Sequence, residues 1–293
     1  MEIFGVPTAL LGSQLLVGLI NGSFYAILSL GLAIIFGLLN IINFTHGAQY
    51  MLGAFVAWIA LTRFEINYWV MLIAAPLLVG AFGVVLERTM LRKLYKLDHL
   101  YGLLLTFGLA LIIEGVFRDQ FGISGESYEV PEALAGGINL GFMFLPIYRA
   151  WVIVASLTVC FGTWFMIEKT KLGAYLRAGT ENPQIVQALG INVPLLITFT
   201  YGYGVALAAF AGVLAAPVFQ VNPLMGSNLI IVVFAVVVIG GMGSIMGSIL
   251  TGIGLGLVEG LTRVFYPEGS AVVVFVIMVI VLLVRPAGLF GKA

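Results

Sequence analysis

Long apolar runs, separated by short polar stretches, dominate this chain. Nine runs are candidate membrane spans: 8–38, 47–62, 68–86, 100–117, 147–167, 195–215, 226–241, 247–265 and 271–284. A spanning helix needs about 20 residues, because it rises ~1.5 Å per residue and the hydrocarbon core is ~30 Å thick. The apolar residues are continuous rather than alternating, which indicates helices and not a membrane β-barrel. The pattern predicts an all-α, polytopic transmembrane bundle of about 8–10 spans, some of them broken.

Composition agrees with this pattern. Of 293 residues, 61% are hydrophobic and only 9% are charged, and the mean hydropathy is +1.15. Soluble domains carry roughly 25% charged residues, so a soluble exterior is excluded. Lys and Arg equal Asp and Glu at 13 each, which leaves no basic arm for nucleic acid. One cysteine and two histidines argue against a disulfide framework and a multi-ligand metal centre.

Basic residues fall unequally on the two sides of the membrane. If the nine spans alternate, one side carries nine Lys and Arg residues and the other carries four. The nine are Arg88, Arg92, Lys93, Lys96, Lys169, Lys171, Arg177, Arg285 and Lys292; the four are Arg63, Arg118, Arg149 and Arg263. Cytoplasmic loops are the ones enriched in Lys and Arg. We therefore expect the 87–99 loop, the 168–194 loop and the C-terminus to be cytoplasmic, and the N-terminus to lie outside.

Two stretches interrupt the apolar pattern. The first is NIINFTHG at 40–47, and the second is GGMGSIMGS at 240–248. Paired interruptions in two halves of a chain indicate broken helices along a substrate pathway. The candidate pathway residues are Asn43, Thr45, His46, Gln49, Gly241, Gly243 and Ser244. Close helix packing through small residues is the alternative, and it weighs more for the glycine run, which has few polar side chains.

Glu114 and Glu259 are the acids expected inside spans. Each precedes an arginine by four residues, Arg118 or Arg263, so each pair shares one helix face near the predicted outer end of a span. An arginine placed there can reach the headgroups, which favours an interfacial ion pair over a proton relay. The two Glu-Gly-x-x-Arg matches also suggest a weak internal repeat.

The 168–194 loop contains a short helix with clear end signals. Asn182 is a good N-cap, Pro183 suits the first helical position, and Gly190 suits the C-terminal cap. A helix of about seven residues is marginal in water by itself. Its apolar residues are Ile185, Val186, Ala188 and Leu189. They are expected to lie against the membrane surface or a partner, unless the segment is an ordinary amphipathic connector.

Motifs of catalysis are absent from the sequence. There is no G-x-x-x-x-G-K-[ST] pattern, so the chain cannot hold ATP phosphates by that device. No Ser–His–Asp set and no H-E-x-x-H pattern presents itself. We therefore predict no catalytic residues, no metal and no cofactor in this chain.

Three stretches resemble the permease subunits of branched-chain amino-acid ABC importers, of the high-affinity leucine/isoleucine/valine type. They are INFTHG at 42–47 with MLGA at 51–54, the segment from 177 to 192 with ENP and ALGIN, and GGMGSIMGS at 240–248. Their order and spacing, and the chain length, agree over essentially the whole sequence. The chain departs from the family pattern at Thr45, where alanine is usual, and at Met246, where proline is usual. The threonine adds a hydroxyl to the candidate pathway.

The resemblance implies one transmembrane permease domain over 1–293, in the bacterial inner membrane. It implies a homologous second permease, two ATPase subunits that bind ATP and Mg, and a periplasmic substrate-binding protein as partners, with membrane lipid around them. The expected substrate is a branched-chain amino acid, although relatives that carry urea, short amides or aromatic acids keep the choice open.

The same resemblance makes the 168–194 loop the segment that docks to an ATPase. The residues implied in this coupling are Arg177, Glu181, Asn182, Pro183, Ala188, Leu189 and Gly190. The alternative function is a stand-alone ion- or proton-coupled secondary transporter. A membrane-embedded enzyme or a scaffold is a third reading, and the missing catalytic motifs argue against the enzyme.

Overall fold

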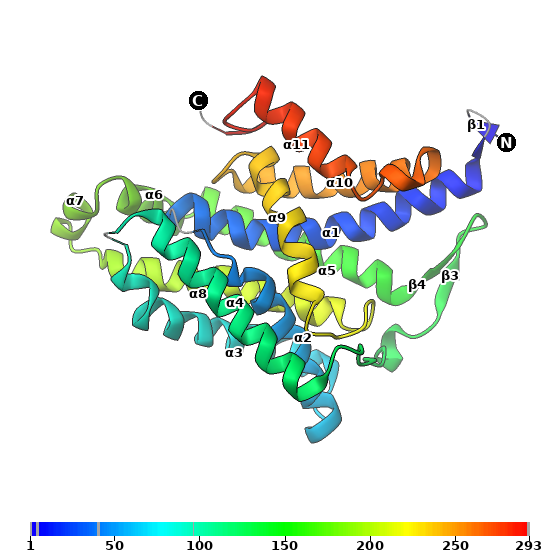
Figure 1. The fold of residues 1–293 in the computed structure, drawn as a ribbon, viewed down its shortest axis with the longest axis horizontal. Helices are drawn as coiled ribbons and strands as arrows, with labels where there is room; N and C mark the ends of the chain where they lie inside the picture. The colour runs from blue at the N-terminus through cyan, green and yellow to red at the C-terminus, as the bar shows by residue number, and fades with distance from the viewer. Residues whose placement is uncertain (1, 4–5, 40–41, 96, 292–293) are drawn as a thin grey trace. The chain divides into compact units, whose positions relative to one another are not determined.

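A computed structural model describes every residue except 1, 4–5, 40–41, 96 and 292–293 (Figure 1). Each of the nine predicted spans is helical: α1 Thr8–Leu39, α2 Thr45–Phe64, α3 Tyr68–Thr89, α4 His99–Phe121, α5 Ile147–Lys169, α8 Val193–Ala215, α9 Met225–Gly240, α10 Ile245–Phe265 and α11 Val273–Val284. The all-α prediction is therefore confirmed. Asn40, Lys96 and Lys292, on which parts of the sequence analysis rest, lie outside the described residues.

The remaining elements are short. Helices α6 Lys171–Glu181 and α7 Pro183–Ala188 lie between α5 and α8, and single 3₁₀ turns are η1 Leu91–Lys93, η2 Glu132–Leu134 and η3 Pro267–Gly269. Strands β1 Glu2–Ile3 and β2 Val6–Pro7 pair antiparallel, as do β3 Gly137–Asn139 and β4 Phe144–Pro146. The sequence analysis placed one helix between α5 and α8 and missed α6, whose charged residues and glycines hide it.

Helix length and hydropathy identify a multi-pass membrane protein. Among the described residues, six helices are long and apolar enough to cross a membrane: α1, α3 with the turn after it, α4, α5, α8 and α10. Helices α9 and α11 are apolar but shorter. Helix α1 continues unbroken for 32 residues, so the polar stretch interrupts the chain after it and not within it.

Contacts divide the chain into two compact units, and each has its own core. Unit 1 comprises 1–29, 129–160 and 232–293. Unit 2 comprises 30–128 and 161–231. Helices α1, α5 and α9 each contribute one part to each unit.

Glycines bring α1 and α10 together in unit 1 (Figure 1). A Cβ at Gly18 would lie 2.4 Å from the carbonyl oxygen of Gly256, and one at Gly252 would lie 2.6 Å from the amide nitrogen of Ala26. The contacts repeat every four residues, through Gly18, Gly22 and Ala26 on α1 and Gly252, Gly256 and Gly260 on α10. This is the small-xxx-small spacing that lets two membrane helices approach through their backbones.

Helix α8 is the centre of unit 2. It packs antiparallel to α3, because Gly202 contacts Gly80 at one level and Thr198 contacts Glu87 at the next. Helix α2 also meets α8, where a Cβ at Gly53 would lie 2.2 Å from the carbonyl oxygen of Ala209. These close backbone contacts hold α2 and α3 against the helix that follows the 168–194 segment.

Candidate functional site

Side chains hold the first break, between α1 and α2. Asn43 Nδ2 donates to Gln49 Oε1 at 3.2 Å, and Gln49 Nε2 donates to Thr45 Oγ1 at 3.1 Å. Thr45 Oγ1 in turn donates to Asn43 Oδ1, so the three side chains close a ring of hydrogen bonds. All three are fully buried. The structure thus brings together the polar residues that the sequence singled out, in a place where lipid offers no alternative partner.

Thr106 on α4 anchors the backbone of this break. Its hydroxyl donates to the carbonyl oxygen of Ile42 at 3.0 Å and accepts from the amide of Phe44 at 3.2 Å. Thr106 is fully buried, and it is the only residue of α4 that is buried among those described. Sequence analysis missed it, because one threonine in an apolar helix gives no local signal.

Tyr201 and His46 complete what we call the polar cluster, which consists of Asn43, Thr45, His46, Gln49 and Tyr201. Both side chains are fully buried. The hydroxyl of Tyr201, on α8, lies beside the side chains of Gln49 and Thr45. The imidazole of His46 packs on Gly31, where an added Cβ would lie 3.0 Å from its Cε1 atom. The polar cluster therefore draws on the first break, α2 and α8, and packs against α1 at Gly31.

Glu87 is a buried acid that the sequence analysis overlooked. Its side chain is 1% exposed and accepts hydrogen bonds from Thr198 at 2.7 Å and from Tyr95 at 2.8 Å. It stands beside Arg88 at the end of a span, and the sequence therefore suggested a loop carboxylate. The hydroxyls of Thr198 and Tyr95 take the place of water as hydrogen-bond donors to this carboxylate.

The hydroxyl of Tyr95 donates its hydrogen bond to Glu87 from outside the spans. It lies beyond the end of α3, outside the spans. Burial, together with the bond to Glu87, raises the pKa of Tyr95 well above its ordinary value. Its hydroxyl therefore stays protonated throughout the physiological range and remains able to donate to Glu87.

The backbone holds the second break, between α9 and α10. Gly241 and Gly243 have φ of +98° and +88°, which residues with side chains rarely adopt. Two amides of the C-terminal segment cap the end of α9: Leu289 N donates to the carbonyl oxygen of Ile239 at 2.8 Å, and Phe290 N donates to that of Gly240 at 3.2 Å. Ser244 caps α10 from within this break, because its Oγ accepts from Gly247 N at 3.1 Å.

These contacts give the glycine run a packing role in unit 1. A Cβ at Gly241 would lie 2.4 Å from the amide nitrogen of Gly291, so the chain passes itself at backbone distance. A part for Gly241, Gly243 and Ser244 in the substrate pathway stays a prediction. The break itself, which the sequence placed at 240–248, is confirmed by the gap between α9 and α10.

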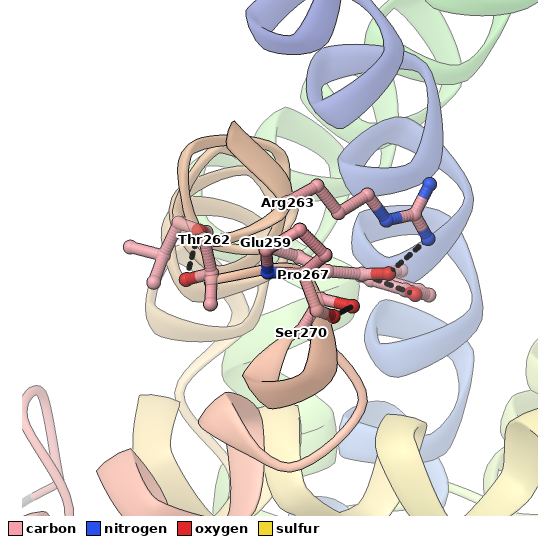
Figure 2. A network of polar contacts seen from close by, with 7 residues as sticks. Glu259, Thr262, Arg263, Pro267 and Ser270 are labelled. Carbon is pink, nitrogen blue, oxygen red and sulfur yellow. Dashed lines mark hydrogen bonds and ion pairs between the residues drawn. The ribbon is translucent and has the colours of Figure 1, made fainter. Parts of the chain in front are cut away.

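The two predicted ion pairs differ in outcome. Figure 2 shows Arg263 reaching Glu259 on α10, with Nη2 and Oε1 2.5 Å apart. Tyr25 also donates to Glu259 Oε2 at 2.8 Å, which ties α1 to α10 inside unit 1. Among the described residues, Glu114 and Arg118 form no ion pair, so that part of the prediction is wrong. The two Glu-Gly-x-x-Arg matches therefore have different surroundings.

Helix α7 confirms its predicted end signals. Asn182 Oδ1 accepts from Ile185 N at 3.2 Å, Pro183 is the first helical residue, and Gly190 has φ of +84°. Asn192 then caps α8 in the same way, accepting from Leu195 N at 3.1 Å. A link of four residues, 189–192, therefore joins α7 to α8.

The apolar residues of α7 divide between the interior and the surface. Val186 is 5% exposed, whereas Ile185 and Leu189 are 59% and 74% exposed. Glu181 and Ala188 are also exposed. Of the coupling residues named above, these surface positions are available for a contact with another chain.

Arg177 has a contact within the chain. Its Nη1 donates to the carbonyl oxygen of Ile167 at 3.2 Å and lies 3.5 Å from Glu168 Oε2. Gly173 packs on the same turn of α5, with no room for a side chain. Arg177 thus ties α6 to the end of α5, which supports the shape of the 168–194 segment.

Apolar spans, a polar cluster among them and two breaks between helices are features of membrane transport proteins. Residues 14–282 match the family described as branched-chain amino acid transport system / permease component. The chain belongs to this family. The resemblance that the three sequence stretches suggested is therefore confirmed.

Named relatives agree with the family match over nearly the full length. The chain is 32% identical to the high-affinity branched-chain amino acid transport system permease protein BraD of Pseudomonas aeruginosa, over 95% of both chains. It is 28% identical to the LivH permease protein of the corresponding Escherichia coli system, again over 95% of both. Identity to the E. coli LivM permease protein is 26%, over 90% of this chain and 67% of LivM.

Proposed function

We propose that this chain is the permease subunit of an ABC importer that moves branched-chain amino acids, or closely related small amino acids or amides, into the bacterial cell. Full-length similarity to BraD and LivH supports the substrate class. The similarity to LivM supports pairing with a second, homologous permease. ATP and Mg would be bound by two partner ATPases, and a periplasmic binding protein would deliver the substrate.

The observation that carries the proposal is the exposed apolar surface of α7. Ile185 lies on α7 and Leu189 is its C-cap residue; this helix of six residues is too short to be stable by itself. A groove on an ATPase subunit would bury these side chains, at about 25 cal/mol for each Å² of apolar surface removed from water. Movement of the ATPase would then pass through the 189–192 link to α8 and to the polar cluster.

The proposal includes an orientation. Helices α6 and α7 face the cytoplasm, together with the 87–99 loop and the C-terminus, and the 119–146 segment faces the periplasm. The excess of Lys and Arg on the cytoplasmic side supports it. A cysteine at Glu129, in a Cys160→Ala background, should therefore react in intact cells with an impermeant thiol reagent; labelling only after permeabilisation would reverse the orientation.

Coupled ATP hydrolysis tests the proposed function. The chain is expressed with a second permease, two ATPases and a binding protein of the proposed transporter, and the complex is reconstituted in liposomes. Leu189→Asp should abolish substrate-stimulated ATP hydrolysis and leucine uptake, because it places a charge in the docking surface. Gln187→Asp adds the same charge at an exposed polar position of α7 and is the matched control.

Two outcomes would overturn the proposal. Normal substrate-stimulated hydrolysis in Leu189→Asp would make α7 a connector only. Leucine exchange by the chain reconstituted alone, without ATPases, would identify a stand-alone secondary transporter instead.

A further inference from the structure

A pocket of about 350 Å³ lies in unit 2, where α8 ends and α9 begins. We call it the amide pocket; its lining residues are Tyr50, Phe219, Gln220, Asn222, Met225, Asn228 and Leu229. Three of these seven carry side-chain amides, and none is charged. Tyr50, which is 1% exposed, lies on α2, the helix that also carries Thr45, His46 and Gln49 of the polar cluster.

The three side-chain amides differ in their hydrogen bonds. Asn222 holds its own turn, because its Oδ1 accepts from Leu224 N at 3.0 Å and its Nδ2 donates to the carbonyl oxygen of Gln220 at 3.1 Å. The side-chain amides of Gln220 and Asn228 are exposed and make no hydrogen bond within the described residues. Each offers one acceptor and two donor hydrogens to a ligand.

The wall that carries Gln220 is braced from outside the pocket. Glu126 and Val221 exchange two backbone hydrogen bonds of 2.9 Å, which fix the segment after α8 to the segment after α4. Gln220 lies over Gly125, where an added Cβ would be 2.6 Å from its Oε1. The position of the amide therefore depends on a glycine at 125, and the pocket wall is a built feature and not a free loop.

Close backbone contact joins the two helices that contribute Tyr50 and Met225 to the pocket. A Cβ at Gly226 would lie 2.1 Å from the carbonyl oxygen of Gly47, so α2 and α9 touch there without side chains between them. This contact fixes α9 against α2 within unit 2.

The chemistry of the lining selects a class of ligand. Without a charged residue in the pocket, an anion such as an aromatic acid, or a cation such as lysine, would lack a counter-charge. A zwitterion brings both charges itself and needs only donors and acceptors, which the amides supply. Phe219, Met225 and Leu229 add an apolar surface for a hydrocarbon side chain.

We propose that the amide pocket is a low-affinity binding site for neutral, zwitterionic amino acids with apolar side chains. This inference rests on the proposed function, since it names the substrate class that the same pathway accepts. Two side-chain amides without charged partners make for weak binding, which suits a site that must release its ligand toward the polar cluster.

Protection of a cysteine from labelling tests the site in the assembled transporter. Leu229→Cys, in a Cys160→Ala background, keeps both amides and places a thiol in the pocket. Leucine at millimolar concentration should slow its reaction with a water-soluble maleimide, whereas benzoate and lysine should not. Ser227→Cys, two residues earlier on α9 and outside the lining, should react at the same rate with and without leucine.

Two substitutions at Asn228, each added to the Leu229→Cys variant, test the contribution of the side-chain amide to binding. Adding Asn228→Leu should raise the leucine concentration needed for protection about fivefold, the effect of one lost hydrogen bond. Adding Asn228→Asp should make lysine protective, because the pocket then holds a negative charge. A pocket wall with only a structural role would not produce this change of selectivity.

The outcomes separate this inference from the proposed function. Leucine-independent labelling of Leu229→Cys, in a preparation that still shows ATP-driven uptake, would overturn the amide pocket alone. Equal protection of Ser227→Cys would also overturn it, because the effect would not be local. Absence of ATP-driven uptake in the parent complex would instead overturn the proposed function.

Discussion

The break before α2 and the break before α10 occupy similar places in the helical pattern but differ in chemistry. In the first, Asn43, Thr45 and Gln49 bond to one another, and Thr106 holds the backbone from a neighbouring helix. In the second, Gly241 and Gly243 adopt positive φ, and the C-terminal segment supplies backbone amides. Side chains maintain one break, and main chain maintains the other.

The difference bears on which break can move. Side-chain hydrogen bonds inside membrane proteins average about 0.6 kcal/mol, so a passing substrate can exchange with them at small cost. A glycine at φ of +98° packed at backbone distance has no nearby alternative conformation. We therefore expect the first break to rearrange during transport, and the second to act as a fixed joint of unit 1.

The largest expected effect is at Gly241. Gly241→Ala should destabilise the protein by about 2 kcal/mol or more, because the new Cβ meets both an unfavourable φ and the backbone of the C-terminal segment. Gly254→Ala is the control: no atom lies within 4 Å of its added Cβ, and it lies within α10. Thermal unfolding followed by size-exclusion chromatography should separate the two variants, and equal midpoints would refute a fixed joint.

The second-largest effect is expected at Thr106, which anchors the backbone of the first break. Thr106→Val keeps the shape of the side chain but removes the hydroxyl that serves Ile42 and Phe44, leaving a buried amide without its partner at a cost of about 1–3 kcal/mol. Thr158→Val removes an exposed hydroxyl that bonds only within its own helix, to Val154. Transport assays at matched expression should show lower uptake for Thr106→Val alone. Unchanged uptake and stability would mean that α4 does not hold the break.

A smaller effect is expected at Ser244, whose hydroxyl accepts the capping hydrogen bond of α10 within the glycine run. Ser244→Ala removes the N-cap of α10, a loss of about 1 kcal/mol. Because the main chain carries this break, uptake should stay close to that of the parent while the unfolding midpoint falls slightly. A large loss of uptake with little loss of stability would return Ser244 to the substrate pathway.

Local signals explain what the sequence predicted well. Hydropathy over about 20 residues is a property of one segment, so the 195–215 run and α8, Val193–Ala215, differ by only two residues at one end. The residues that cap α7, from Asn182 to Gly190, likewise lie within ten positions of one another in the sequence. Polar residues in an apolar context also stand out, which is why the first break was recognised.

Contacts between distant segments explain what the sequence missed. Glu87 is buried by Thr198, which is 111 residues away, and Thr106 acts on residues more than 60 positions earlier. The contact between Gly18 and Gly256 could not be predicted, because the chain has 37 glycines. The spacing of glycines within one helix does not indicate which other helix they contact. Residues that line the amide pocket, such as Gln220 and Asn228, come together only in the three-dimensional arrangement of α8 and α9, which no local sequence pattern predicts.

The smallest expected effect measures the ring of the first break directly. Asn43→Ala and Gln49→Ala each remove one hydrogen bond between the two side chains and one bond to Thr45. The double variant should therefore be less damaging than the sum of the two, with a coupling energy of about 0.6 kcal/mol, the average for such pairs in membrane proteins. Unfolding in mixed detergent and lipid gives the four free energies that this cycle needs. A coupling near zero, with uptake lost in both single variants, would mean that each side chain contacts the substrate separately rather than through the ring.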